Sequence, residues 1–284
     1  MLIADSGTTE TVWCWVEGGC FVNSVQTEGI NPFFQSYEEI VYILQDGLIP
    51  QTKGISFDVV CFYGAGCLNE KADIVEKAIR NVISAGSIHV YSDLLAAAHG
   101  VYGHEAGIVC IMGTGSNSCF FDGERIVKNV PSLGYILGDE GSGSMLGRML
   151  LSDVQKGILP EPLRNAFFER FSLTQMEILE RVYRRPFPNR FLASLSPFLV
   201  EHIDVPEISM LVKKCFTAFI ERNVMQYDYQ NYPVNFAGSI SWYYQDILRE
   251  VAEDKDIYVG KIVKSPMAGL LQYYGVTDAY RSDS

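Results

Sequence analysis

The chain has 284 residues, of which 48% are hydrophobic and 20% charged, so we expect one large domain or two medium ones with a substantial core. Its 22 basic and 34 acidic residues give a formal charge of −12, which excludes nucleic acid and anionic membrane surfaces as expected partners. An anionic small molecule is still allowed if backbone N–H groups, an Mg²⁺ ion or a few basic side chains neutralise it locally.

The N-terminal and cysteine patterns predict a cytoplasmic protein. The first ten residues, MLIADSGTTE, lack the basic and apolar regions of a signal peptide, and no stretch approaches the roughly 20 apolar residues of a membrane span. The seven cysteines contain no C-x-x-C motif, and most lie in apolar runs, which is typical of buried, reduced thiols. The four histidines lack the spacing of a zinc site.

The first third of the chain is predicted to form three short strands and then alternating helices and strands. The predicted strands are residues 2–5, 11–16, 20–27, 57–63 and 87–91. The predicted helices are residues 36–49, 69–84 and a helix that begins at 94. This order is typical of an open α/β sheet that begins with an antiparallel hairpin.

The first turn, Asp5-Ser6-Gly7-Thr8-Thr9, combines an acid, a glycine and hydroxyls. Its backbone N–H groups and the Thr9 hydroxyl can hold a phosphate, while Asp5 orders Mg²⁺ through water. A plain hairpin loop explains the same sequence equally well.

Asp93 also has two interpretations, because it lies at the carboxyl end of one strand and at the start of a helix. It is either an N-cap or a catalytic group at the functional edge of the sheet.

The strand pattern restarts at Gly107. The predicted strands are residues 107–112, 118–121, 125–129, 234–237 and 257–259. The predicted helices are about 142–155, 160–171, 173–184, 191–201, 207–229, 242–253 and 267–274. Arginines at 181, 184, 185 and 190 are expected on a solvated face. The repeat predicts a second half that resembles the first, with helices inserted at about 142–230.

Two glycine-rich loops follow the restart closely. MGTGSN spans residues 112–117 and GDEGSG spans residues 138–143. Glycines let the backbone approach a ligand, and successive N–H groups can bind an anion. The pair therefore indicates a phosphate cradle beside a carboxylate site.

These motifs together resemble a known family. Two βββαβαβα halves, each with a Gly/Thr loop at its first hairpin, resemble the actin–hexokinase–heat-shock ATPase fold. DSGTT, MGTGSN, GDEGSG and Ser-Asp93 ahead of AAA at 96–98 resemble the N-acetylglucosamine kinase family, which is grouped with BadF/BadG-type ATPases. The likeness runs nearly end to end, because AGSISW at 237–242 resembles the family's adenosine-side loop and PMAGLL at 266–271 its closing helix.

The resemblance implies an α/β fold of two ribonuclease H-like domains with an ATP cleft between them. The first domain would cover residues 1–106, and the second residues 107–264 with the helical insertion. A C-terminal helix at 265–280 would pack back on the first domain. The implied activity is an ATP- and Mg²⁺-dependent kinase acting on a hydroxyl of an amino sugar, above all N-acetylglucosamine. A homodimer is compatible with this assignment.

The resemblance also implies roles for individual residues, with Asp93 as the catalytic base. The implied ATP- and phosphate-binding residues are Asp5, Gly7, Thr8, Thr9, Gly113, Thr114, Gly115, Ser116, Ala193, Gly238 and Ser239. The implied sugar-binding residues are Asn31, Asp93, Ser132, Leu133, Gly134 and Asp139. Asp5 would hold Mg²⁺ through water. Ser6, Thr8, Glu10 and Leu133 depart from the family pattern, which leaves the identity of the sugar open.

Other functions stay open at this point. N-acetylmuramic acid and glucosamine are alternative substrates. Activator ATPases of 2-hydroxyacyl-CoA dehydratases resemble the same fold but carry an iron–sulfur cluster, for which Cys61 and Cys67 are the nearest candidates. A non-catalytic sugar sensor is disfavoured, because no DNA-binding segment is present and both Asp93 and Asp139 are.

Overall fold

The computed structural model describes residues 1–52 and 54–277. It divides into two compact units. Unit 1 contains Met1–Val109, Phe121–Val127 and the chain from Ser265 onward, and unit 2 contains Cys110–Phe120 and Lys128–Lys264. In the described residues, none of the helices has the length and apolar character needed to cross a membrane.

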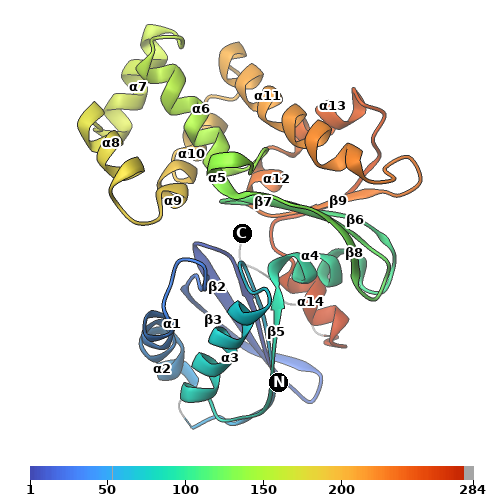
Figure 1. The fold of residues 1–284 in the computed structure, drawn as a ribbon. Helices are drawn as coiled ribbons and strands as arrows, with labels where there is room; N and C mark the ends of the chain where they lie inside the picture. Colours follow the sequence, from blue (N-terminus) through green and yellow to red (C-terminus); the bar gives the residue numbers. More distant parts are fainter. Residues whose placement is uncertain (53, 278–284) are drawn as a thin grey trace. The chain divides into compact units, whose positions relative to one another are not determined.

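Unit 1 is built on a five-stranded sheet in the order β3-β2-β1-β4-β5. Figure 1 labels its strands β2, β3 and β5. Its strands are β1 (Leu2–Ser6), β2 (Glu10–Glu17), β3 (Cys20–Glu28), β4 (Phe57–Gly64) and β5 (Ala85–Ser92). Its helices are α1 (Tyr37–Ile43), the π-helix η1 (Leu44–Leu48), α2 (Ile49–Thr52), α3 (Glu70–Val82), α4 (Asp93–Tyr102) and α14 (Met267–Tyr273). β1 pairs antiparallel with β2 and parallel with β4, and β4 pairs parallel with β5.

The central strands β1 and β4 of unit 1 are buried on both faces, toward which successive residues of a strand alternately point, whereas the edge strand β3 is largely exposed. On one face Leu2, Ala4 and Phe62 pack with Ile40 of α1 and Ile79 of α3. On the other face the buried clusters join Ile3 and Cys61 to α14, through Met267, Leu270 and Leu271, and to Ala96 of α4. Burial on both faces explains why β1 and β4 have near-continuous apolar sequences rather than an alternating pattern.

The second sheet has the strand order β10-β9-β6-β7-β8. Its strands are β6 (Gly107–Met112), β7 (Ser116–Phe121), β8 (Ile126–Val130), β9 (Val234–Ala237) and β10 (Val259–Val263). Read from the other edge, the order is third, second, first, fourth and fifth strand, as in unit 1. The duplicated α/β fold predicted from the sequence is therefore confirmed.

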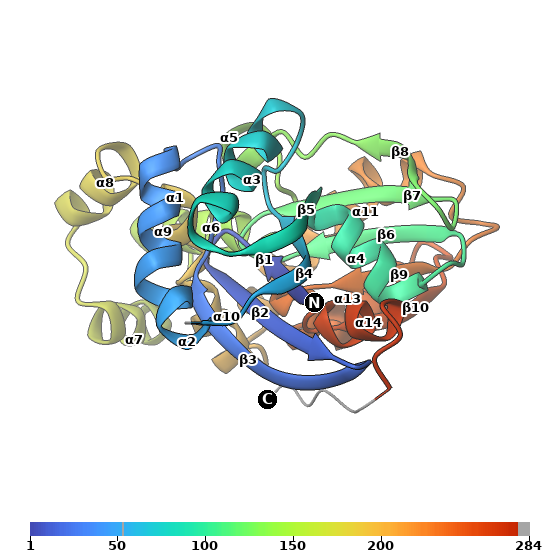
Figure 2. The ribbon, with the colours of Figure 1, turned by 90° about the horizontal axis from the view of Figure 1, so that it is seen from below.

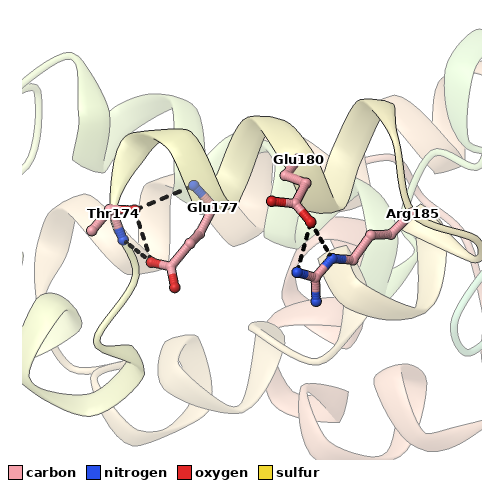
Figure 3. Close-up of polar contacts among 4 residues, drawn as sticks. All are labelled: Thr174, Glu177, Glu180 and Arg185. Atoms are coloured by element: carbon pink, nitrogen blue, oxygen red, sulfur yellow. Dashed lines mark hydrogen bonds and ion pairs between the residues drawn. The ribbon is translucent and has the colours of Figure 1, made fainter.

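The second half has more helices than the first (Figure 2). They are α5 (Gly134–Leu137), α6 (Gly143–Gln155), α7 (Glu161–Phe171), α8 (Gln175–Tyr183), α9 (Pro188–Ala193), α10 (Ser196–Glu201), α11 (Pro206–Arg222), the 3₁₀-helix η2 (Val224–Gln226), α12 (Ser239–Tyr243) and α13 (Gln245–Glu253). α8 begins with a capping box between Thr174 and Glu177, and its exposed Arg185 pairs with Glu180 at 2.7 Å (Figure 3). At Arg185 the arginine-rich segment thus faces solvent, as expected.

Several predicted boundaries were wrong. The helix expected at 191–201 is two helices, and Pro197 lies in the first turn of the second, where its missing N–H is tolerated. The helix expected at 207–229 ends at Arg222, and the one expected at 242–253 is two helices, α12 and α13, which are separated at Tyr244. The last strand lies at 259–263 rather than 257–259, because the Ile257 N–H donates to the Ala252 carbonyl and closes the end of α13.

The C-terminal helix was expected to reach residue 280. α14 is Met267–Tyr273, and residues 278–280 of that prediction lie outside the described residues. Within unit 1, α14 packs against α4. The short helix α5 and the π-helix η1 were not predicted.

Candidate functional site

Two acids lie at one edge of the sheet of unit 1. Ser6 at the end of β1 pairs with Gly64 of β4, and Gly64 pairs with Ser92 at the end of β5. Because these three strands are parallel, their carboxyl ends meet at the same edge. Asp5 precedes Ser6 and Asp93 follows Ser92, so the register brings both carboxyl groups to this edge, as predicted for Asp93.

Asp93 is the first residue of α4 and not its N-cap. The N-cap is Ser92, whose hydroxyl accepts a hydrogen bond from the Leu95 N–H at 3.2 Å. The Asp93 Oδ1 atom accepts from the Leu94 N–H at 2.8 Å. The capping interpretation of Asp93 is therefore wrong, and its carboxylate sits at the positive end of the α4 dipole.

Both acids have strongly shifted pKa values. The pKa of Asp5 is raised to about 7, first by burial and then by the charge of Asp93, while the Ser265 hydroxyl opposes the shift. Burial also raises the pKa of Asp93 to about 6, against the hydrogen bond from Leu94. A carboxyl group that titrates near neutrality in a polar site is suited to general base catalysis.

Ser6 anchors the 5–9 loop. The Gly7 N–H donates to the Glu10 carbonyl at 2.9 Å, and the Gly29 N–H donates to the Thr9 carbonyl at 3.0 Å. The buried Ser6 hydroxyl lies 2.6 Å from the Thr11 hydroxyl and accepts from the Ile30 N–H at 3.0 Å. The departure from the family pattern at Ser6 thus has a structural role, which is to join the loop to the segment before Asn31.

Asn31 is held at the same edge of unit 1. Asn31 is only 6% exposed, and its Oδ1 atom accepts a hydrogen bond from the Phe33 N–H at 3.0 Å. Its own N–H donates to the Gln35 Oε1 atom at 2.7 Å. A Cβ at Gly66, which follows β4 with a φ of 74°, would lie 2.4 Å from the Asn31 Oδ1 atom. Only glycine leaves room for this asparagine.

In unit 2 the two glycine-rich loops bind each other. The Ser116 N–H donates to the Asp139 Oδ1 atom at 3.2 Å, and the Ser116 hydroxyl donates to the Glu140 carbonyl at 2.6 Å. The Gly143 and Ser144 N–H groups donate to the carbonyls of Gly113 and Thr114 at 2.8 and 3.1 Å. Loop 113–116 is therefore fixed by the segment that follows it.

Asp139 lies at the centre of this arrangement. It has a positive φ of 54°, is 7% exposed, and burial raises its pKa to about 6 against the hydrogen bond from Ser116. Its N–H donates to the Ser132 carbonyl at 3.0 Å, so the segment Ser132-Leu133-Gly134 lies beside it. Leu133 itself is exposed.

Gly143 marks where the predicted nucleoside-side residues meet loop 113–116. A Cβ there would lie 3.1 Å from the Ala193 Cβ atom and 3.3 Å from both the Gly113 carbonyl oxygen and the Ile240 Cδ1 atom. Gly238 and Ser239 directly precede Ile240, and a Cβ at Gly238 would lie 2.3 Å from the Met112 carbonyl oxygen. Unit 2 therefore brings together Ala193, the 238–239 turn and the glycine-rich loop.

The predicted site residues thus form two clusters, one in each unit. The unit 1 cluster contains Asp5, Gly7, Thr8, Thr9, Asn31 and Asp93. The unit 2 cluster contains Gly113, Thr114, Gly115, Ser116, Ser132, Leu133, Gly134, Asp139, Ala193, Gly238 and Ser239.

The whole chain is similar to one solved structure. This is a candidate N-acetylglucosamine kinase from Porphyromonas gingivalis, which is 44% identical, with a TM-score of 0.92 over 97% of this chain and 98% of that chain. The chain belongs to the N-acetylglucosamine kinase-like family.

Two further proteins are similar. The N-acetyl-D-glucosamine kinase of Dictyostelium discoideum is 29% identical over 170 residues. The matched region covers 56% of this chain and 53% of that enzyme, so this chain spans about half the length of the enzyme. A candidate N-acetylglucosamine kinase from Chromobacterium violaceum has a TM-score of 0.76 and 17% identity, over 96% of this chain and 98% of that chain, and shows the same fold. No protein-family model matches the chain.

Sequence reasoning missed several neighbours of the site in this family member. Ser265 donates to the Asp5 Oδ2 atom at 3.4 Å, and Arg222 pairs with Glu140 at 2.7 Å. Gly66, beside Asn31, was also missed. Ser265 directly precedes the PMAGLL motif, so its position was a signal, whereas nothing in the sequence relates Arg222 to Glu140, 82 positions away.

The unit 1 cluster fits the Mg²⁺ ion that the family implies. Asp5 lies near the negative charges of Asp93 and Glu10, and no basic side chain is among the groups that shift its pKa. Within the described residues, no three His, Cys, Asp or Glu side chains are arranged to hold a metal ion. A hard cation that keeps most of its waters, bound by one or two carboxylates and by phosphate, is the type that suits such a site.

The iron–sulfur alternative gains nothing from the cysteines. Cys61 and Cys67 are each 3% exposed, and burial raises the pKa of both thiols. Ligation of iron requires thiolates.

Proposed function

We propose that this protein is an ATP-dependent kinase that phosphorylates a hydroxyl of an amino sugar, with N-acetylglucosamine as the first candidate. The observation that carries the proposal is the unit 1 cluster. In it, Asp93 lies close enough to Asp5 for its charge to raise the pKa of Asp5, and both acids lie at the same sheet edge as Asn31. Membership of the kinase-like family supports it.

Asp93 is the proposed base. With a pKa of about 6 its carboxylate is mostly ionised at neutral pH and is still basic enough to accept the proton of a sugar hydroxyl. Phosphoryl transfer needs positioning and charge stabilisation more than covalent chemistry from the protein. Bound ATP would supply the phosphoryl group, and Asp5 would hold, through water, an Mg²⁺ ion that neutralises the phosphate charge.

The other residues bind and orient the two reactants. Backbone N–H groups and threonine hydroxyls of loops 5–9 and 113–116 contact phosphate oxygens. Ala193, Gly238 and Ser239 lie beside the nucleoside. Asn31, Asp139 and the segment 132–134 hold the sugar. Exclusion of water when the sugar binds prevents hydrolysis of ATP without phosphoryl transfer to the sugar. The proposed location of the protein is the reducing cytoplasm, which was predicted from the cysteines.

The test is ADP release measured with purified protein and a panel of sugars: N-acetylglucosamine, glucosamine, N-acetylmuramic acid and glucose. We expect ADP release that depends on an amino sugar and is largest with N-acetylglucosamine. ADP release that no sugar stimulates, together with bound iron, would favour the activator ATPase. Sugar binding without any turnover would favour a sensor.

A further inference from the structure

Ser265 stands where the chain passes from one unit to the other. Lys264 is the last residue of unit 2, and Ser265 is the first residue of the C-terminal segment of unit 1. Its hydroxyl has two partners in unit 1. It donates to the Asp5 Oδ2 atom at 3.4 Å and accepts from the Met267 N–H at 3.2 Å. One side chain therefore connects the start of α14 to the carboxyl group at the sheet edge.

The position of this hydroxyl is fixed by helix packing. A Cβ at Gly269 would lie 1.7 Å from the Gly100 carbonyl oxygen, and a Cβ at Gly100 would lie 2.7 Å from the Pro266 carbonyl oxygen. The backbones of α4 and α14 thus touch at these glycines. The Tyr274 hydroxyl, just after α14, lies 2.8 Å from the Tyr63 hydroxyl of β4. Ser265 is held by contacts on both sides of its helix rather than by a free loop.

The carboxyl group that Ser265 contacts needs orientation. Asp5 is surrounded by negative charge from Asp93 and Glu10. A carboxylate that rotates away from its proper direction cannot order the waters of a hydrated cation. A hydroxyl that donates to the Oδ2 atom restricts the rotation of this carboxyl group without engaging its Oδ1 atom.

We propose that Ser265 is a positioning residue whose hydroxyl orients the Asp5 carboxylate for the hydrated Mg²⁺ of the bound nucleotide. This inference rests on the proposed kinase function. It adds a residue outside the phosphate-binding loops, and it couples the first residue after unit 2 to the metal-binding side of unit 1.

The alternative role of Ser265 is purely structural, namely to accept from Met267 at the start of α14. Substitutions at the same position separate the two roles. Ser265→Thr keeps both the donor and the acceptor. Ser265→Ala removes both. Ser265→Asp keeps an acceptor, which suits a helix start, but it has no donor and places a third negative charge beside Asp5 and Asp93.

The experiment measures kcat, the KM for the sugar and the Mg²⁺ concentration for half-maximal rate in the full-length protein. Calorimetry of Mg²⁺–ADP binding gives a readout apart from activity, and thermal unfolding reports the structural effect. We expect Ser265→Ala to raise the required Mg²⁺ concentration about tenfold with little change in the sugar KM, since a hydrogen bond to a charged group has about this effect. Ser265→Thr should restore it, and Ser265→Asp should be worse than Ser265→Ala.

The control is Thr174→Ala, which removes a capping hydroxyl in unit 2 that is remote in sequence from the site (Figure 3). It should lower thermal stability and leave the Mg²⁺ requirement unchanged. The proposal is overturned if Ser265→Asp requires no more Mg²⁺ than the parent protein, or if Ser265→Ala does not change Mg²⁺–ADP binding. If the parent protein phosphorylates no amino sugar, the kinase function fails, but Mg²⁺–ADP calorimetry still decides the role of Ser265.

Discussion

At the scale of single residues, Asp93 and Asp5 share a sheet edge but differ in their hydrogen bonds. Asp93 accepts a hydrogen bond from a backbone N–H at the start of α4, whereas Asp5 accepts a hydrogen bond from the side-chain hydroxyl of Ser265. The sequence could predict that both acids follow or end strands, because apolar runs show where strands stop. It could not predict their pKa values, which depend on burial by segments far apart in the chain.

Asp93→Asn should lower kcat by about 10²–10⁴-fold, the usual contribution of a general base. The amide keeps the size of the side chain, so nucleotide binding should change little. Steady-state kinetics and calorimetry with ADP measure the two effects. Full activity in this variant would exclude Asp93 as the base.

The rate should also fall in acid. Asp93 must be ionised to accept a proton, and burial raises its pKa to about 6. The value of kcat/KM should therefore decrease as the pH falls from about 7 through about 6, the range in which Asp5 and Asp139 also titrate. A pH–rate profile between pH 5 and 9, with buffers of constant ionic strength, measures this acid limb. A profile that stays flat down to about pH 5 would contradict the assignment.

Asp5→Asn should stabilise the ligand-free protein while reducing its activity. The pKa of Asp5 rises from 3.8 in its ordinary state to about 7 in the fold, so the unfolded chain loses this proton first and the stability of the protein falls as the pH rises from about 4 to about 7. At pH 8 the gain in the free energy of unfolding should be about 2–4 kcal/mol, since one pKa unit corresponds to about 1.4 kcal/mol. It should shrink toward pH 5 and vanish near pH 4. Urea unfolding at several pH values tests this, and a gain that does not depend on pH would argue against it.

At the scale of helices and strands, local patterns predicted the regular elements better than their ends. Most residues of β1 and β4 are apolar because helices cover both faces of these strands, and this signal is plain in the sequence. The boundaries near Pro197 and Ile257 depend on individual hydrogen bonds. The short helix α5 follows Leu133, which has a left-handed backbone conformation that no residue type indicates.

Helix packing gives a prediction at this scale. A Cβ at Gly147 of α6 would lie 1.8 Å from the Leu192 carbonyl oxygen of α9. Gly147→Ala should push α9, and Ala193 with it, away from Gly143. We expect a loss of about 1–3 kcal/mol in the free energy of unfolding, typical of overpacking, and a higher KM for ATP. The exposed Gln155→Ala at the other end of α6 is the control. An unchanged KM for ATP in Gly147→Ala would separate α9 from nucleotide binding.

At the scale of the whole molecule, the repeated order of elements predicted two similar sheets, and both have the same strand order. The fold and the family could be predicted from three motifs at characteristic places. DSGTT and MGTGSN each lie at the turn after the first strand of a sheet, and GDEGSG lies directly before helix α6. The identity of the sugar could not be predicted, because it depends on side chains such as Leu133 that sit in irregular segments. The contact between Asp139 and Ser116 could likewise not be predicted, because the two residues are 23 positions apart in the sequence.

The central claim is that a phosphoryl group moves from ATP to an amino sugar with Asp93 as base. Mass spectrometry and ³¹P NMR of the products, after incubation of the protein with ATP, Mg²⁺ and N-acetylglucosamine, test it most directly. The account predicts one sugar monophosphate for each ADP formed, and an initial rate of formation of both products that is about 10²–10⁴-fold lower with Asp93→Asn. Inorganic phosphate in place of a sugar phosphate, or equal product formation by Asp93→Asn, would contradict it.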